Sequence, residues 1–337
     1  MQPTIAEKKL QTQAVVTKEK KGKRNLISLE KLKNWAWVIV RSVLIIGLSF
    51  VILYPILLKV SIAFKQRMDL YDPTIVYIPR NFTLENFKYV LETMDYFKVL
   101  LNSFLLSGGT MLLTTLACAV VGYGFARFKF KGSNILFALV ILTILVPPQT
   151  IMVPTYLQYR NFDIFGIIGL FNDGKGIKLI GTYWPFIISS ITAMGLKAGL
   201  FIFIFRQFFK GVPKEIEEAA LVDGAGVFKI FIKIMLPNAV PAMITVMLFS
   251  FVWQWNDIYF TTMFLEQASV LSSQLQIAGS TIAYNLSTAG GQGATDPSYL
   301  SMLVNTSVLL SILPLIIMYM FVQRHFVESV ERAGIVG

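Results

Sequence analysis

Two short stretches of this sequence have residue types and spacings that could do chemistry, and the first is rich in glycine. Residues 169–176 read Gly-Leu-Phe-Asn-Asp-Gly-Lys-Gly, with the glycines and the lysine spaced as in a phosphate-binding P-loop. A P-loop needs Ser or Thr after the lysine to hold magnesium, and it connects a strand to a helix. Here Gly176 stands in that place and no strand pattern precedes it. We therefore reject this interpretation and expect the chain to bind no nucleotide of its own.

The second stretch is Trp253-Gln254-Trp255-Asn256-Asp257, which lies inside a long apolar segment. Paired tryptophans can stack on sugar rings, and Asn and Gln can hydrogen-bond to hydroxyl groups. A carboxylate in hydrocarbon is costly, so Asp257 should face a bundle interior or a water-filled path. The same run could instead pack helices together near a membrane interface, where tryptophan is common. Both interpretations stay open, and the candidate pathway-lining residues are Trp253, Trp255, Asn256 and Asp257.

The sequence contains no recognisable catalytic or metal-binding arrangement. Cys118 is the single cysteine and lies in an apolar run, so a disulfide within the chain is impossible. His325 stands alone without ligand-type residues at a useful spacing. No Ser/His/Asp set and no carboxylate pair was found. We expect no catalytic residue, no metal and no cofactor bound by this chain.

Composition indicates which elements must position these residues. The 337 residues are 55% hydrophobic and only 15% charged, with a mean hydropathy of +0.64, whereas soluble domains carry roughly 25% charged residues. The net charge of +11 is not arranged for nucleic acid, because nine Lys or Arg residues precede Trp35 and most others flank apolar segments. An integral membrane protein in a lipid bilayer, without a nucleic-acid partner, is the first hypothesis.

Six apolar segments approach the ~20 residues that a helix needs to cross a bilayer. They cover residues 38–63, 103–125, 135–156, 183–205, 240–265 and 303–322. With the N-terminus inside, the cytoplasmic parts hold 19 Lys and Arg residues and the external parts eight. The positive-inside rule therefore assigns both termini to the cytoplasm. The predicted fold is all-α, a polytopic membrane protein with six transmembrane helices.

Several segments between the spans have expectations of their own. Residues 1–34 are basic and predicted to be a disordered cytoplasmic tail. In the external stretch 65–102, Thr83 could cap a short amphipathic helix. The external loop 266–302 contains Gly290–Gly293 and no Lys or Arg, and it is either a flexible connector or a contact for an external partner. Lys197 lies either inside the fourth span, where a cation suggests function, or in water beyond it.

A polar interruption of 33 residues, 206–238, separates the fourth and fifth spans. A helix is predicted to begin at Pro213, followed by three glutamates whose charges complement the positive helix end. Gly224 and Gly226 permit a left-handed stop or a close backbone approach. A second short helix should follow and end at Pro237. The interruption is thus predicted to be a cytoplasmic two-helix loop.

The residue pattern of this loop resembles the coupling loop of bacterial ABC-importer permeases. It consists of Glu218-Ala219-Ala220, Asp223-Gly224-Ala225, Leu236-Pro237 and Pro241 at fixed spacing, with Phe231 and Ile234 between them. The runs 126–132, 206–209 and Trp255-Asn256-Asp257 extend the resemblance to the carbohydrate-uptake, maltose-transporter-like permeases of type I. It covers most of residues 80–325, and the basic tail lies outside it.

The resemblance implies a permease subunit in a bacterial cell membrane, with no enzymatic activity of its own. Its expected partners are a second homologous permease subunit, two ATP-binding subunits that hold ATP and magnesium, and an extracytoplasmic solute-binding protein. Transport of a sugar or oligosaccharide would proceed by alternating access. The residues implied to dock on the ATPase are Glu218, Ala219, Ala220, Asp223, Gly224, Ala225, Leu236 and Pro237.

The implied organisation follows the sequence in four parts. These are the basic tail 1–34, the first span with its external segment 35–98, the permease core 99–325 and a cytoplasmic tail 326–337. Two alternatives remain. The cargo of an ABC permease could be a solute other than sugar, or the chain could be a stand-alone secondary transporter. A secondary transporter is expected to have inverted repeats and several charged residues inside the membrane. The sequence displays neither feature.

Overall fold

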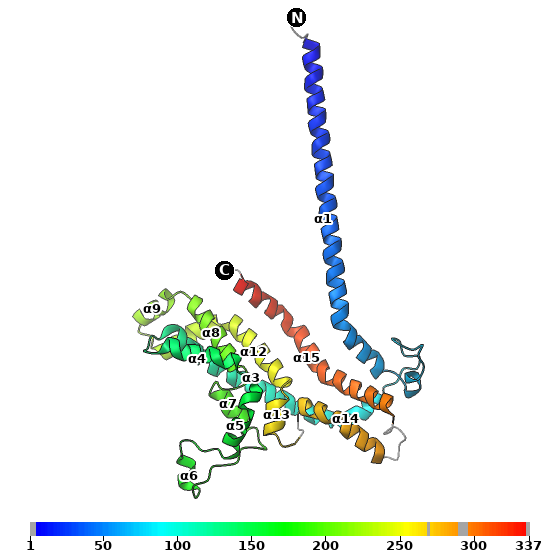
Figure 1. Cartoon of the computed structure of the whole chain (residues 1–337). Helices are drawn as coiled ribbons and strands as arrows, with labels where there is room; N and C mark the ends of the chain where they lie inside the picture. The colour runs from blue at the N-terminus through cyan, green and yellow to red at the C-terminus, as the bar shows by residue number, and fades with distance from the viewer. Residues whose placement is uncertain (1–4, 268–269, 289–295, 335–337) are drawn as a thin grey trace. The chain divides into compact units, whose positions relative to one another are not determined.

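The computed structural model describes the backbone of residues 5–267, 270–288 and 296–334, and the side chains of residues 31–267, 270–288 and 296–323 (Figure 1). These residues form helices and no strand, apart from isolated bridges between Lys65 and Phe82 and between Phe162 and Ile177. The all-α prediction is therefore confirmed for the described residues. The chain divides into two compact units, residues 1–61 and 62–337.

The first unit consists of most of helix α1 (Ile5–Ala63). Residues 31–63 of this helix are long and apolar enough to cross a membrane, as the sequence predicted. Of the tail 1–34 that was predicted to be disordered, residues 5–34 belong to α1 in the structure. The reason is local. This stretch contains no proline and many Ala, Gln, Glu and Lys residues, which favour helix even where few apolar residues are available to pack.

The second unit is built from shorter helices around α3. In chain order its elements are η1 (Arg67–Leu70), α2 (Glu85–Thr93), α3 (Tyr96–Arg127), α4 (Ser133–Leu145), α5 (Pro148–Arg160), α6 (Ile167–Phe171), α7 (Trp184–Ile191), α8 (Ala198–Gly211), α9 (Glu215–Val222), α10 (Val227–Ile230), the π-helical turn η2 (Phe231–Met235), α11 (Leu236–Asn238), α12 (Val240–Trp255), α13 (Tyr259–Phe264), α14 (Leu271–Thr288) and α15 (Pro297–Gly334).

Helix α3 is the centre of this unit, because α7, α8 and α12 all pack against it. Helices α3 and α8 approach each other closely at Gly122. If residue 122 had a side chain, its Cβ atom would lie 2.6 Å from Cβ of Phe205. Only glycine allows this separation. Cys118 is fully buried in the same apolar cluster as Phe201 and Phe205, where a free thiol packs as a small apolar side chain.

The apolar segments are more broken than six continuous spans. Three described helices can cross a membrane by length and composition: residues 31–63 of α1, α3 and residues 297–323 of α15. Two further candidates are bent pairs, α4 with α5 at 105° and residues 227–238 with α12 at 76°. Counting each bent pair as one span gives five. The structure thus supports three to five spans, and the fourth predicted segment, 183–205, is split into α7 and α8.

Each interruption has a local cause. Between α4 and α5, Pro147 and Pro148 remove two backbone donors. Between α7 and α8, Ala193 and Lys197 adopt positive φ angles of 54° and 59°, which cannot continue a right-handed helix. Lys197 therefore lies at the start of α8 and not within a continuous span. The fifth predicted segment stops at Trp255 and resumes in α13.

The predicted loop 266–302 contains a helix that the sequence analysis missed. Helix α14 covers 18 residues, packs against α15 and buries Leu271, Ala278 and Ile282. The glycine-rich run 290–293 lies outside the described residues. Scattered Ser, Gln and Thr residues between these apolar positions had concealed the helical period.

The stretch after α1 is ordered by polar groups that are buried. Lys65 donates from Nζ to the carbonyl of Ile75 at 2.7 Å, and both carboxylate oxygens of Asp69 accept hydrogen bonds from Asn81. Thr83 Oγ1 accepts from the backbone N–H of Glu85 at 3.2 Å at the start of α2. The predicted short helix is confirmed as α2, but its N-cap is Leu84, whose side chain makes no capping hydrogen bond, so Thr83 lies one residue before the cap.

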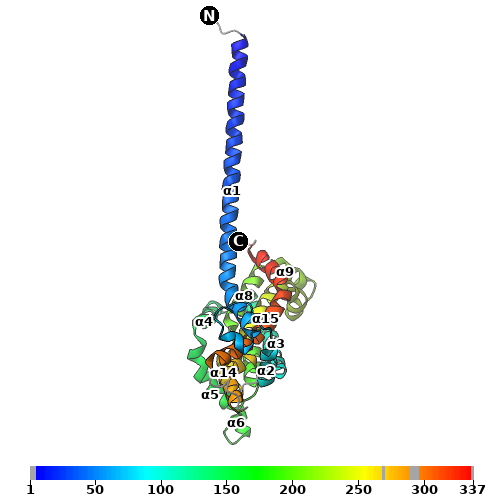
Figure 2. The same cartoon turned by 90° about the vertical axis from the view of Figure 1, so that its right-hand side faces the viewer.

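The segments at the two ends of the second unit form two sets. Helix α9 and the C-terminal part of α15 lie toward one end in both views, whereas α6 and α14 lie toward the other (Figures 1 and 2). The end of α3 joins the first set, because Arg127 contacts Glu217 of α9. This grouping agrees with the sides that the Lys and Arg count assigned to these segments.

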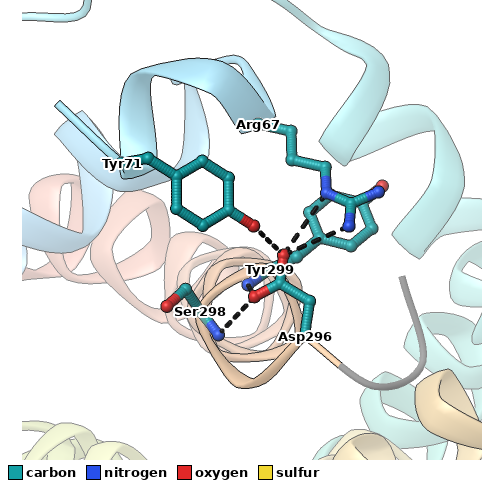
Figure 3. A network of polar contacts seen from close by, with 5 residues as sticks. All are labelled: Arg67, Tyr71, Asp296, Ser298 and Tyr299. Carbon is teal, nitrogen blue, oxygen red and sulfur yellow. Dashed lines mark hydrogen bonds and ion pairs between the residues drawn. The ribbon is translucent and has the colours of Figure 1, made fainter. Parts of the chain in front are cut away.

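A polar network attaches η1 to the start of α15 (Figure 3). One Asp296 carboxylate oxygen accepts hydrogen bonds from the Tyr71 hydroxyl and from Arg67 Nε, the latter at 3.3 Å. The other oxygen accepts from the backbone N–H groups of Ser298 and Tyr299, which open α15. The Arg67 guanidinium also lies 4.9 Å from the centre of the Tyr299 ring. Asp296 thus caps α15 and joins it to η1.

These donors lower the pKa of Asp296 below its usual value, the hydrogen bond from Tyr71 contributing most. A carboxyl group whose folded pKa is depressed stabilises the fold above its unfolded pKa of about 3.9 and loses that contribution as the pH falls through the folded value. We therefore expect Asp296→Asn to lower the melting temperature between pH 5 and 8. The difference from the wild type should vanish when the pH falls below the folded pKa of Asp296, in thermal unfolding of the purified protein.

Asp95→Asn is the matched control, because Asp95 is an exposed carboxylate with only a 3.8 Å ion pair to Lys98. It should leave the melting temperature unchanged. An Asp296→Asn difference that persists undiminished at the lowest pH would show that the lost charge is not the cause.

Candidate functional site

The loop between α8 and α12 begins as the sequence predicted and differs in detail. Helix α9 starts two residues after Pro213, with Glu215, Glu217 and Glu218 in its first turn. It ends in a left-handed turn at Gly224, whose φ is +78°. There the N–H of Ala225 donates to the carbonyl of Ala220 at 3.0 Å. The predicted left-handed stop at Gly224 is confirmed.

The second half of the loop is helical beyond the expected end. The run 227–238 passes through the π-helical turn η2, and its last turn, α11, includes Pro237 near the start. Pro237 therefore does not end the helix. A proline is tolerated at the first position of a helix, where its missing N–H needs no partner. The change of direction comes instead at Ala239, before α12.

One face of the loop is anchored in the helix core. Ala220, Ile230 and Met235 are buried, and the Phe231 ring lies 5.0 Å from the ring of Tyr123 on α3. Phe209 of α8 completes this aromatic group, 5.5 Å from Tyr123. Because aromatic side chains bury large areas, the cluster fixes the loop on the ends of α3 and α8.

An ion pair reinforces this attachment. Arg127 Nε at the end of α3 lies 2.9 Å from Glu217 Oε1, and the two side chains are only 6% and 15% exposed. Arg127 Nη2 also donates to the carbonyl of Val212 at 2.7 Å, just before α9. A charge pair so removed from water is harder to break than a surface pair. The sequence analysis used Glu217 only as a helix-start residue and missed this contact.

The opposite face of the loop is exposed and partly apolar. Val222 and Phe228 are 88% and 75% exposed. Of the residues implied to dock on a partner, Glu218, Ala219, Asp223, Gly224 and Pro237 are exposed. Ala225 and Leu236 are half-buried, and Ala220 faces the core. Exposed apolar side chains gathered on one loop are typical of a surface that another protein covers.

A second feature is a polar cavity deeper in the unit. Its volume is about 70 Å³, room for a few water molecules. Residues of α3, α5, α7, α12 and α13 line it, and the hydroxyl or amide side chains among them are Thr110, Thr114, Thr155, Ser189, Ser190, Ser250 and Gln254. Gln254 Nε2 is buried and has no hydrogen-bond partner among the described residues. A buried unpaired donor at a cavity wall indicates a place for a hydroxyl group or water.

The four predicted pathway residues are not among the residues that line this cavity, and they have other contacts. The Trp253 ring stacks between Phe201 and Phe249 at 5.6 and 5.4 Å, with Lys197 Nζ 6.0 Å from its centre. Trp255 is buried and donates from Nε1 to the carbonyl of Ser311 at 3.3 Å. Of the stretch 253–257, the cavity lining includes only Gln254.

The other two are helix-end residues. Asn256 is exposed and donates from Nδ2 to the carbonyl of Val252 at 2.8 Å. Asp257 is buried and accepts from the backbone N–H and the hydroxyl of Thr261, both at 2.9 Å. It therefore holds the start of α13. The Ser and Thr residues that line the cavity were missed because single hydroxyl side chains in apolar helices give no periodic signal. Thr110, for example, hydrogen-bonds to its own helix.

Comparison with known proteins gives a consistent result. A model of the family described as "Binding-protein-dependent transport system inner membrane component" matches residues 118–332. The chain is 27% identical over 293 residues to the arabinooligosaccharides transport system permease protein AraQ of Halalkalibacterium halodurans, covering 86% of this chain and 93% of that protein. It is 25% identical over 295 residues to the polygalacturonan/rhamnogalacturonan transport system permease protein YtcP of Bacillus subtilis, covering 86% and 94%.

Among solved structures, the fold is similar to a bacterial ABC transporter involved in the import of the acidic polysaccharide alginate. The TM-score is 0.68 at 21% identity, with 86% of this chain and 96% of that chain covered. At this identity the likeness concerns the fold alone.

The ion pair between Arg127 and Glu217 can be tested by a double-mutant cycle. We expect Arg127→Gln and Glu217→Gln to be coupled by about 1–3 kcal/mol in the free energy of unfolding, because the pair is largely removed from water. The measurement is reversible unfolding in detergent of the wild type, both single variants and the double variant.

The exposed pair Lys178–Glu266, whose side chains are 56% and 54% exposed at 2.8 Å, supplies the comparison. Its cycle should give less than about 1 kcal/mol. Equal coupling energies in the two cycles would contradict a special anchoring role for Arg127 and Glu217.

Proposed function

Because the chain belongs to the family of binding-protein-dependent transport system inner membrane components, we propose that it is a permease subunit of an ABC importer. It carries a sugar or oligosaccharide across the bacterial cell membrane by alternating access, and a partner ATPase drives the movement. The observation that best supports this function is the structure of the α9–α11 loop. Its inner face is anchored on α3 and α8, whereas its outer face exposes apolar and acidic side chains.

The loop is the part that connects the two proteins. Glu218, Ala219 and Asp223 offer a low, acidic surface, and exposed Val222 and Phe228 add apolar area for a cleft on the ATPase. Ala220, Ala225, Gly224, Leu236 and Pro237 shape and support this surface. Because the ion pair and the aromatic cluster join the loop to α3 and α8, a displacement of the loop is passed to the helices that line the cavity.

The remaining subunits follow from this assignment. A second homologous permease subunit completes the pathway, and two ATP-binding subunits hold the ATP and magnesium. The family description supports an extracytoplasmic solute-binding protein that delivers the cargo. This chain itself binds no cofactor.

The proposed topology has six crossings with both termini in the cytoplasm. Five are the candidate spans and bent pairs, and the sixth is α7 with α8, whose break lies beside the polar cavity. The distribution of Lys and Arg supports the cytoplasmic side for the α9–α11 loop. Residues 1–34 and 326–337 are then cytoplasmic, residues 35–98 hold the first span with its external segment, and 99–325 form the permease core.

The side chains that line the cavity indicate the chemical class of the transported molecule. Its lining offers hydroxyl groups and the unpaired amide of Gln254, with no charged side chain among the lining residues. Such a surface suits the hydroxyl groups of an uncharged saccharide better than a carboxylate-rich one. The arabinooligosaccharide name of one relative supports this class. In the alternating-access cycle the cavity widens. The helix that contributes Gln254 to the cavity ends at Trp255, and the chain resumes as a helix in α13. The predicted pathway residues border this break between α12 and α13, and they are Trp253, Trp255, Asn256 and Asp257.

Gly224→Asp tests the docking role of the loop. No atom lies within 4 Å of a side chain added at Gly224, yet its φ of +78° strains any residue other than glycine by about 1–2 kcal/mol. We expect uptake of a labelled neutral oligosaccharide to fall about tenfold or more, while the amount of protein in the membrane stays normal.

Gly226→Asp is the matched control, because Gly226 is two residues away, equally open and extended at φ −68°. It should retain most of the uptake. Normal uptake by Gly224→Asp would contradict the docking role, and solute movement by the purified chain in vesicles without an ATPase would overturn the ABC assignment.

Gln254→Leu tests the cavity. Loss of a buried amide that hydrogen-bonds the cargo should reduce uptake of a neutral oligosaccharide, presented with its binding protein, by about tenfold or more. ATP hydrolysis without cargo should stay unchanged. Gln323→Leu, which alters an exposed amide outside the cavity lining that donates only to the Met320 carbonyl of its own helix, should change uptake little. If the two variants behave alike, the cavity is not on the pathway.

A further inference from the structure

A second cavity lies at the end of the unit where α3 ends and α4 begins, and it is strongly basic. Its volume is about 820 Å³. We call it the basic cavity, because five cationic side chains line it: Arg127, Lys129, Arg206, Lys210 and Lys214. They come from the end of α3, the turn after it, α8 and the residue before α9. No acidic side chain is among the lining residues.

Most of this charge is uncompensated. Arg127 pairs with Glu217, whereas within the described residues the other four have no carboxylate within ion-pair distance. Arg206 lies with its guanidinium 3.6 Å from the centre of the Phe137 ring, and its Nε is buried without a hydrogen-bond partner among these residues. A half-buried guanidinium held in this way has donors left for an anion.

The start of α4 adds to the positive potential. Gly132, Ser133 and Asn134 line the basic cavity, and α4 is a helix of 13 residues that begins at Ser133. The first N–H groups of a helix have no partner within it and carry a partial positive charge, which favours phosphate groups. The helix start is thus a second, weaker contribution beside the cationic side chains.

The basic cavity opens onto an apolar strip. Ile135 belongs to its lining, and Leu139 and Leu142 follow at helical spacing. All three are exposed within this unit, by about half or more. A cationic cavity at the end of a membrane-crossing helix, continued by an apolar helix face, matches a molecule with an anionic head and hydrocarbon chains. It does not match a water-soluble anion, which would gain nothing from the strip.

From this arrangement we propose that the basic cavity binds the phosphate headgroup of an anionic phospholipid, with an acyl chain lying along Ile135, Leu139 and Leu142 of α4. Lys129, Lys210 and Lys214 attract the headgroup, and Arg206 and the start of α4 hydrogen-bond to its phosphate. The proposal depends on the membrane location of these helices and not on the cargo or on the docking of the ATPase. It assigns a lipid site at the ends of α3 and α8, next to the start of the α9–α11 loop.

The test measures lipid binding to the transporter purified with this full-length chain and its co-purifying subunits in a neutral detergent. Native mass spectrometry counts bound phosphatidylglycerol and phosphatidylcholine during titration. The variant Lys129→Gln/Lys210→Gln/Lys214→Gln should bind phosphatidylglycerol about tenfold or more weakly than the wild type, given the contribution of each basic residue near an anionic headgroup. Phosphatidylcholine binding should not change.

Lys88→Gln/Lys131→Gln/Lys175→Gln is the matched control, because it removes the same charge from exposed lysines outside the cavity lining. It should stay within about twofold of the wild type, since it leaves the local contacts intact. Equal losses in the two triple variants would overturn the proposal in favour of general electrostatic attraction. Undiminished phosphatidylglycerol binding by the cavity variant would overturn it as well.

Competition with inorganic phosphate tests whether the basic cavity binds a lipid or a soluble anion. At millimolar concentration it should fail to displace phosphatidylglycerol if the acyl chain contributes to binding. Displacement by phosphate at concentrations equal to the lipid would identify a site for a free anion and contradict the lipid assignment.

Discussion

Hydrocarbon offers a backbone N–H or C=O no hydrogen-bond partner, so a chain this apolar must satisfy its backbone within helices or with its own side chains. The interruptions of its helices show how this is done. Asp257 accepts the Thr261 N–H where α13 begins. Met194, Gly195 and Leu196, in the break between α7 and α8, line the polar cavity. Irregular backbone thus gathers where polar groups and water can satisfy it, and the same places can change conformation during transport.

The other end of the unit meets a different requirement. A loop that passes movement from one protein to another must be firmly attached on one side and accessible on the other. Arg127 meets the first condition by joining α3 both to the Val212 carbonyl and to Glu217. Val222 and Phe228 meet the second by remaining exposed. The basic cavity shares Arg127 with this attachment.

Features that depend on near neighbours in the sequence were predictable. The turn at Gly224 and the short helix α2 after Thr83 follow from local backbone preferences, and both were found. Composition and the charge count likewise indicated an all-α membrane protein. Features that depend on distant contacts were not predictable, such as the helicity of α14, which rests on packing against α15. The breaks at residues 192–197 and 256–258 were missed for another reason, because the hydropathy of the sequence is continuous across them.

The sequence alone determined the class of the protein and predicted where the two-helix loop lies, because apolar length, charge asymmetry and a spaced motif are properties of the chain. It could not determine which side chains surround the cavity. Thr110, Ser190 and Gln254 lie on three helices and come together only when α3, α7 and α12 pack. The same holds for the partnership of Arg127 with Glu217, which are 90 positions apart in the chain. Contacts between residues so far apart in the sequence depend on how the helices pack and which side chains they bury. A local sequence pattern therefore does not predict them.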